Sequence, residues 1–110
     1  MKIYLADPRN PGDTYPDPAE WTVVRGYWEF MALLADQGDD FTVVSFDHDL
    51  GETATGKLLE TGYDAIKDWV DLMCPDPTLV EVRVHSANPV GAENIRAYWR
   101  SWCKHWARES

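Results

Sequence analysis

The stretch that decides the fold is Phe41-Thr42-Val43-Val44-Ser45-Phe46, which runs directly into Asp47-His48-Asp49-Leu50-Gly51. The first half is almost continuously apolar, which is typical of a strand buried on both faces of a parallel sheet. The second half is polar and acidic, and in open α/β sheets ligands bind beyond the carboxyl ends of the strands. The stretch therefore predicts a parallel α/β sheet with functional side chains directly after a buried strand.

Further strands and helices fit the sequence on both sides of this stretch. Strands are expected at 2–6, 21–25 and 79–84, where β-branched and aromatic residues cluster. Helices are expected at about 27–37, from 61 to about 73, and from 89 onward. Their buried stripes are predicted to be Tyr27, Phe30, Met31 and Leu34, then Ile66, Trp69, Val70 and Met73, then Ile95, Trp99, Trp102 and Trp106.

Helix ends and loops are also marked in the sequence. Gly38 is expected to cap the end of the first helix, Thr61 and Asp64 form a capping-box pattern, and Asn88 precedes Pro89 as an N-cap. The Pro-rich segment 8–20 excludes a regular helix, and 51–60 is predicted to be a mobile loop. The alternation of strands and helices predicts a mainly parallel sheet.

The composition limits the class of protein. A chain of 110 residues is expected to form one domain, residues 1–110. The net charge of −9 opposes non-specific DNA binding and is compatible with a cation site or with imitation of a polyanion. Cys74 and Cys103 form neither a disulfide framework nor a zinc pattern. With no signal-peptide or membrane-span pattern, a cytoplasmic protein with no membrane partner is expected.

Polar residues follow three of the predicted strands, and Arg25 ends the other one. The clusters are Asp7 with Arg9, then Arg25, then Asp47-His48-Asp49, then His85-Ser86-Ala87-Asn88. Because the carboxyl ends of parallel strands share one edge, we expect these side chains to converge there. Each cluster also has a structural interpretation, in which the acids form turns, His85 is a satisfied core histidine and Asn88 is only a cap.

Converging residues of these types point to phosphoryl chemistry. Asp7, Asp47 and Asp49 are candidate oxygen ligands for Mg²⁺ or Mn²⁺. The start of the last helix, at Ser86 and Asn88, could bind an anion. Arg9 and Arg25 could clamp a phosphate as a pair of arginines. For proton transfer, His48 and His85 are the candidates. No nucleophile elbow, Walker loop or dinucleotide glycine fingerprint is present.

Two motifs carry a resemblance that spans almost the whole chain. They are Val44-Ser45-Phe46-Asp47-His48-Asp49-Leu50-Gly51 and Val84-His85-Ser86-Ala87-Asn88-Pro89-Val90-Gly91, supported by Thr61-Gly62-Tyr63-Asp64 and by the segments 4–11 and 21–25. With them the chain resembles the cyclic-phosphate processing receiver domain, a small relative of response-regulator receiver domains.

The resemblance implies a shortened flavodoxin-like fold with about four strands, in the order 2-1-3-4, and about three helices. It also implies that Asp47 occupies the phosphoacceptor position, Asp7 a metal-binding position and Ser86 a small hydroxyl position. The implied activity is binding or hydrolysis of cyclic phosphates, in nucleotides or at RNA ends.

Two departures keep alternatives open. Ala6 stands where relatives carry a second acid, and the one late lysine, Lys104, lies in the last predicted helix, which argues against aspartyl-phosphate signalling. A metal-dependent phosphoesterase is the leading hypothesis. The alternatives are a non-catalytic module that binds a phosphate ligand or a protein partner, and an acidic inhibitor of phage or mobile-element origin.

Overall fold

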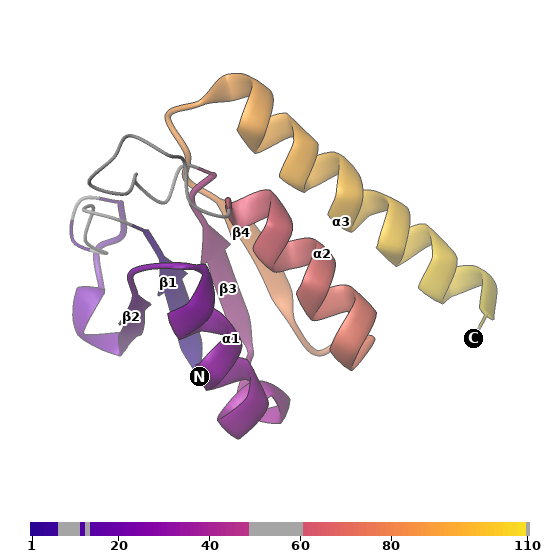
Figure 1. Cartoon of the computed structure of the whole chain (residues 1–110), viewed down its shortest axis with the longest axis horizontal. Coiled ribbons are helices and arrows are strands. Elements are labelled where there is room, and N and C mark those ends of the chain that lie inside the picture. The colour runs from indigo at the N-terminus through magenta and orange to yellow at the C-terminus, as the bar shows by residue number, and fades with distance from the viewer. Residues whose placement is uncertain (7–11, 13, 49–60, 110) are drawn as a thin grey trace.

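The computed structural model describes residues 1–6, 12, 14–48 and 61–109 (Figure 1). Four strands form one sheet: β1 (Lys2–Leu5), β2 (Trp21–Val24), β3 (Val43–Phe46) and β4 (Glu81–Val84). They are all parallel and lie in the order β2-β1-β3-β4. The predicted sheet and its strand order are therefore confirmed. Each strand is one or two residues shorter than the sequence pattern suggested.

Three α-helices follow the strands as predicted: α1 (Tyr27–Gln37), α2 (Gly62–Met73) and α3 (Pro89–Glu109). Two single 3₁₀ turns, η2 (Pro18–Glu20) and η3 (Gly38–Asp40), complete the described elements. Between β1 and β2 the described residues form only η2, which agrees with the prolines of that segment. The predicted mobile loop at 51–60 lies outside the described residues. No helix in the described part of the chain is long and apolar enough to cross a membrane.

The helix caps mostly follow the predictions. Thr61 Oγ1 accepts a hydrogen bond from the Asp64 amide at 3.3 Å, and the Thr61 amide donates to the Asp64 carboxylate at 2.8 Å. Asn88 Oδ1 accepts from the Gly91 amide at 3.0 Å and caps α3. Gly38 is the C-cap of α1, as predicted, and its right-handed backbone (φ −57°, ψ −31°) continues into η3. The left-handed cap is Cys74, with φ 46° and ψ 57°, at the end of α2.

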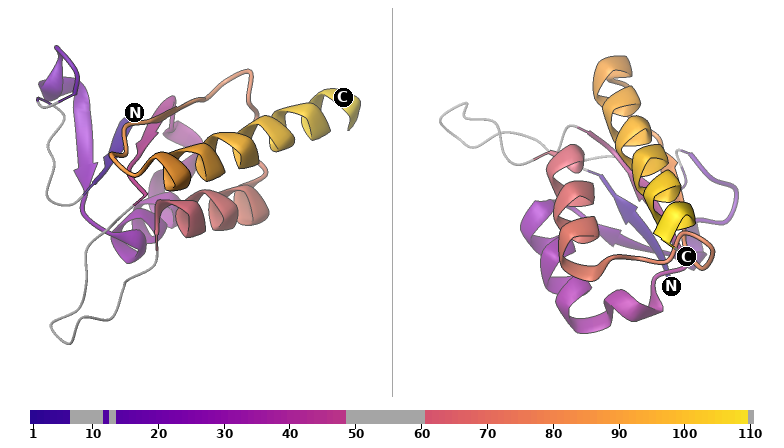
Figure 2. Two further views of the ribbon diagram at one scale, coloured as in Figure 1. Left: turned by 90° about the horizontal axis from the view of Figure 1, so that it is seen from above. Right: turned by 90° about the vertical axis from the view of Figure 1, so that its right-hand side faces the viewer.

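All three helices pack on one face of the sheet and build the main core there (Figure 2). Trp69 lies at its centre, and its ring stacks on Trp99 of α3 at 5.5 Å and 6°. The buried residues of this core are Ile3, Leu5, Val24, Phe30, Leu34, Phe41, Val44, Phe46, Ala65, Ile66, Trp69, Val70, Val80 and Ile95. Burying so many large apolar side chains is the main source of stability of the fold.

The predicted stripes fade at their ends. Met73 at the end of α2 is 36% exposed, and the three tryptophans of α3 are only half-buried. Figure 1 shows that α3 continues past the end of α2, so its last turns have no helix beside them.

The opposite face of the sheet carries a second cluster, which we call the aromatic face: Tyr4, Tyr15, Trp21, Ser45, Arg83 and His85. Tyr4 and Trp21 are buried there, and Tyr15 stacks on Trp21 at 4.6 Å and 10°. These strand residues reach this face because side chains alternate along each strand. Ser45 and Arg83, for example, are paired neighbours in the β3–β4 ladder.

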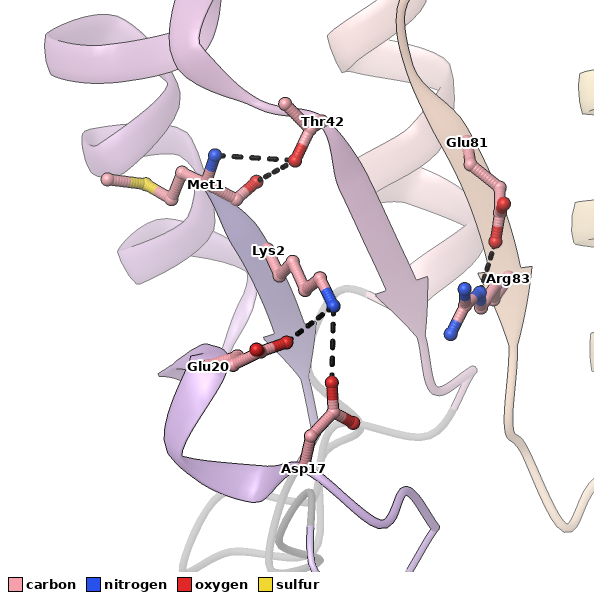
Figure 3. A network of polar contacts seen from close by, with 7 residues as sticks. All are labelled: Met1, Lys2, Asp17, Glu20, Thr42, Glu81 and Arg83. Carbon is pink, nitrogen blue, oxygen red and sulfur yellow. Dashed lines mark hydrogen bonds and ion pairs between the residues drawn. The ribbon is translucent and has the colours of Figure 1, made fainter.

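Polar contacts fix the start of β1 (Figure 3). The Lys2 ammonium pairs with Glu20 at 2.8 Å and Asp17 at 3.2 Å, which ties the strand to η2 and the residues before it. The amino group of Met1 donates to the carbonyl of Asp40 at 2.7 Å. These contacts hold the amino-terminal end of the sheet, at the edge away from the predicted site.

Candidate functional site

Backbone hydrogen bonds continue one residue beyond three strands at the carboxyl edge of the sheet. The amide of Ala6 donates to Val24 O at 3.1 Å, that of Asp47 to Leu5 O at 2.9 Å, and that of His85 to Phe46 O at 3.0 Å. Ala6, Asp47 and His85 therefore lie side by side at this edge. Asp47 and His85 are two predicted site residues that are 38 positions apart in the sequence, and the structure places them at the ends of the neighbouring strands β3 and β4.

Asp47 lies at the centre of this edge and is only 8% exposed. The start of α2 is pressed against its backbone, because a Cβ atom added to Gly62 would lie 1.9 Å from Asp47 O. The Gly62 amide also donates to His48 O at 2.8 Å. The first turn of α2 thus fixes the backbone that carries the Asp-His pair.

His48 lies against the first turn of α3. A Cβ atom added to Gly91 would meet His48 Cγ at 2.3 Å, so the imidazole occupies the space that a side chain at this position would need. Residues 47 and 48 are therefore held between the beginnings of α2 and α3, where helix dipoles favour negative charge.

Arg25 spans the end of β1. Its Nη1 donates to the Ala6 carbonyl at 3.2 Å, and its backbone amide donates to Glu29 Oε2 at 3.1 Å. The guanidinium is therefore positioned at the residue that directly precedes Asp7. Asp7 itself, with Arg9 and Asp49, lies outside the described residues.

Ser86 and Asn88 serve the local structure at the start of α3. Ser86 Oγ accepts from the Asn88 amide at 3.1 Å, and Asn88 Oδ1 accepts from Gly91. The capping interpretation of Asn88 is confirmed. An anion at this helix start would meet the remaining amides and the Ser86 hydroxyl rather than the Asn88 oxygen.

The two predicted histidines point to different sides of the sheet. The His85 ring stacks on Tyr4 at 4.2 Å and 10°, on the aromatic face, and its Nδ1 lies 2.7 Å from Ser45 Oγ. His48 packs instead against α3. Both histidines follow strands at the carboxyl edge, but their rings lie on opposite faces of the sheet and do not act together as a pair.

Comparison with protein families decides the identity of this arrangement. The chain matches the family of the cyclic-phosphate processing receiver domain over residues 1–101. It belongs to that family. Comparisons with curated proteins and with solved structures return no match. The matched range includes all four strands of this receiver domain, α1, α2 and most of α3.

The predicted metal ligands of the receiver domain can be placed only in part. Of Asp7, Asp47 and Asp49, the described residues include Asp47 alone. Within those residues, no three acidic, histidine or cysteine side chains gather in a way that could hold a metal ion. A nearly buried carboxylate at the carboxyl edge suits Mg²⁺ or Mn²⁺, but the other oxygen ligands would have to come from the two aspartates outside the described residues.

Three residues that the sequence analysis did not select lie next to the candidate site residue His85 or its partner: Tyr4, Tyr15 and Ser45. Ser45 had a signal, since it is the polar residue inside an otherwise apolar strand. It is fully buried, and a buried hydroxyl requires a partner. Tyr15 had none, because it approaches Ser45 only through the path of the Pro-rich segment.

Proposed function

We propose that this receiver domain binds a cyclic phosphate ester at the carboxyl edge of its sheet and hydrolyses it with the help of a divalent cation. The observation that carries the proposal is the position of Asp47, nearly buried at the centre of that edge and held between the first turns of α2 and α3. Membership of the family supports the cyclic phosphate as ligand.

The proposed ligands of Mg²⁺ or Mn²⁺ are Asp47 together with Asp7 and Asp49. When bound, the cation would polarise a phosphoryl oxygen or lower the pKa of an attacking water. In the reaction, water oxygen bonds to phosphorus and one ester P–O bond of the ring breaks. The product is a phosphate monoester, and the departing oxygen takes up a proton. Asp47, at the phosphoacceptor position, is the alternative nucleophile.

The remaining side chains have separate roles in this proposal. Arg25, with Arg9, neutralises charge on the phosphate, and its contact with Ala6 O already holds it at the edge. His48, between the edge and α3, or His85 gives the proton to the departing oxygen. Ser86 adds a hydroxyl donor at the start of α3. The substrate is a cyclic nucleotide or the cyclic end of an RNA.

Phosphorus NMR tests the proposal directly. The full chain would be incubated with 2′,3′-cyclic and 3′,5′-cyclic nucleotides and Mg²⁺ or Mn²⁺, beside Asp47→Asn and the surface control Asp36→Asn. We expect ring opening by the wild-type protein and by Asp36→Asn, and a loss of about 100-fold or more in Asp47→Asn. Equal turnover by wild type and Asp47→Asn would refute the mechanism.

One observation favours a second candidate, a module that binds the ligand without cleaving it. Position 6, where relatives carry an acid, is a fully buried alanine whose carbonyl anchors Arg25. Fewer carboxylates would weaken cation binding while leaving the arginine for the phosphate. In the same experiment, a shifted phosphorus resonance without product would support this candidate over the phosphoesterase.

A further inference from the structure

A chain of hydrogen bonds leads across the aromatic face to His85. The Tyr15 hydroxyl lies 2.8 Å from Ser45 Oγ, and Ser45 Oγ lies 2.7 Å from His85 Nδ1. Ser45 is fully buried, and Tyr4 stacks on the imidazole at 4.2 Å. The ring of His85 is thus fixed in its plane by Tyr4 and at one nitrogen by Ser45.

Arg83 gives this chain a direction. Its guanidinium lies 5.3 Å from the centre of the Tyr15 ring and pairs with Glu81. The hydrogen bond with Glu81 raises the pKa of Arg83, which keeps the guanidinium over the Tyr15 ring charged. A cation over the ring draws electron density from the phenol, so the Tyr15 hydroxyl is a stronger donor and a weaker acceptor than an ordinary one. The imidazole nitrogen at the other end is the strongest acceptor of the three groups, so the Tyr15 O–H points to Ser45.

The rest of the direction follows from the number of hydrogens. Ser45 accepts from Tyr15, and its single O–H then points to His85 Nδ1, which must act as the acceptor. A neutral imidazole has one donor nitrogen and one acceptor nitrogen. The hydrogen of the ring is therefore on Nε2.

We propose that Tyr15 and Ser45 are positioning residues that hold neutral His85 as its Nε2–H tautomer, so that the ring presents a hydrogen-bond donor at Nε2. The catalytic part of this inference rests on the proposed function. His85 follows β4 at the carboxyl edge, but its Nε2 is buried, so a ligand at that edge would have to reach this atom for the donor to contact a phosphoryl or departing oxygen. The hydrogen bonds from Tyr15 through Ser45 to His85 would also couple the Pro-rich segment to the carboxyl edge.

Nitrogen NMR of the full chain, labelled with ¹⁵N-histidine, measures the tautomer without any ligand or cation. The chain has three histidines, so His48→Gln and His105→Gln assign the signals of His85. Spectra would be recorded at about pH 8.5, where an ordinary imidazole is neutral. Wild type is compared with Tyr15→Phe and Ser45→Ala. Tyr4→Phe is the matched control, because the Tyr4 hydroxyl bonds to Thr14 and takes no part in the hydrogen bonds from Tyr15 through Ser45 to His85.

We expect His85 to show the Nε2–H tautomer alone in wild type and Tyr4→Phe, and a mixture of both tautomers in Tyr15→Phe and Ser45→Ala. Tyr15→Phe keeps the stacked ring, so it stays informative if Ser45→Ala fails to fold. An Nδ1–H tautomer in wild type, or a spectrum of Tyr15→Phe identical to that of wild type, would overturn the inference.

Turnover separates this inference from the proposed function. If wild type opens cyclic phosphates, Tyr15→Phe should lower kcat by about tenfold with little change in KM, a part of the 10²–10⁴-fold typical of general acid catalysis. A protein without turnover that shows the predicted tautomers would refute the proposed function and leave the positioning roles intact. Normal kcat and a normal tautomer in Tyr15→Phe would refute the positioning roles alone.

Discussion

Two glycines at helix starts set the geometry of the candidate site, and they differ in what they touch. A Cβ atom at Gly62 would lie 1.9 Å from a backbone oxygen, that of Asp47. A Cβ atom at Gly91 would lie 2.3 Å from the side chain of His48. A backbone atom held by neighbouring strands cannot move aside, whereas an imidazole can rotate away. The same substitution should therefore have different consequences at the two positions.

Gly62→Ala should destabilise the fold. The start of α2 would have to move away from Asp47, and overpacking of this kind costs about 1–3 kcal/mol. Gly26→Ala is the control, because nothing lies within 4 Å of a Cβ atom there. Urea unfolding of both variants measures the difference. Equal free energies of unfolding would show that α2 does not press on the backbone of residue 47.

Gly91→Ala should leave stability almost unchanged but displace His48. Alanine in place of glycine in a helix gains up to about 1 kcal/mol, which offsets the cost of moving the ring. Proton NMR of the His48 imidazole should report a new environment. If His48 gives the proton, kcat should fall together with that change. An unperturbed His48 signal would contradict the contact with α3.

At the scale of single elements, Asn88 has a structural and a proposed functional role that can be separated. Asn88→Ala removes the cap of α3 and should cost about 1 kcal/mol of stability, while Asn88→Ser keeps a capping oxygen and should cost much less. Thermal unfolding measures both. If Asn88→Ser loses as much stability as Asn88→Ala, the hydrogen bond to Gly91 is not the stabilising contact.

The elements themselves were largely predictable from the sequence, because their signals are local. Apolar period, prolines and capping residues predicted the strands, α1, α2 and α3 with errors of one or two residues at the ends. Gly38 caps α1 as expected, but its backbone is right-handed and continues into η3 instead of adopting the left-handed conformation common at glycine caps. Local sequence patterns do not indicate which face of the sheet each helix covers.

The candidate site was predictable only where it depends on local sequence. Asp47 was predictable because a buried parallel strand delivers its next residue to the carboxyl edge. The hydrogen-bond partners of His85 were not. Ser45 is 40 positions from His85 and meets it only because β3 and β4 are neighbours, and Tyr15 reaches Ser45 only through the path of the Pro-rich segment. The separation of His48 and His85 onto two faces is likewise a property of the assembled sheet.

At the scale of the whole molecule, the contacts of Lys2 predict a pH dependence of stability. Hydrogen bonds with the side chains of Glu20 and Lys2 lower the pKa of Asp17 from 3.8 to about 2. Because the pKa of Asp17 is lower in the folded state, its carboxylate stabilises the fold at pH values above its pKa in the unfolded chain. This contribution disappears as the pH falls through about 2.

Asp17→Asn should therefore be less stable than wild type at neutral pH, and the difference should shrink between about pH 4 and pH 2. Urea unfolding at several pH values measures it, with the exposed Asp39→Asn as control. A difference that stays constant down to pH 2 would show that the ion pair with Lys2 does not link β1 to the segment before β2.

Amide NMR with a cyclic nucleotide and Mg²⁺ shows directly whether the ligand binds at the carboxyl edge of the sheet. The amino-terminal edge provides the contrast, because a cavity of about 260 Å³ lies there among Gly38, Phe41, Met73 and Leu79. We expect the amides of Ala6, Asp47, His48 and Gly91 to shift on binding while those around this cavity do not. Shifts confined to the cavity, or spread along α3 away from Gly91, would contradict it.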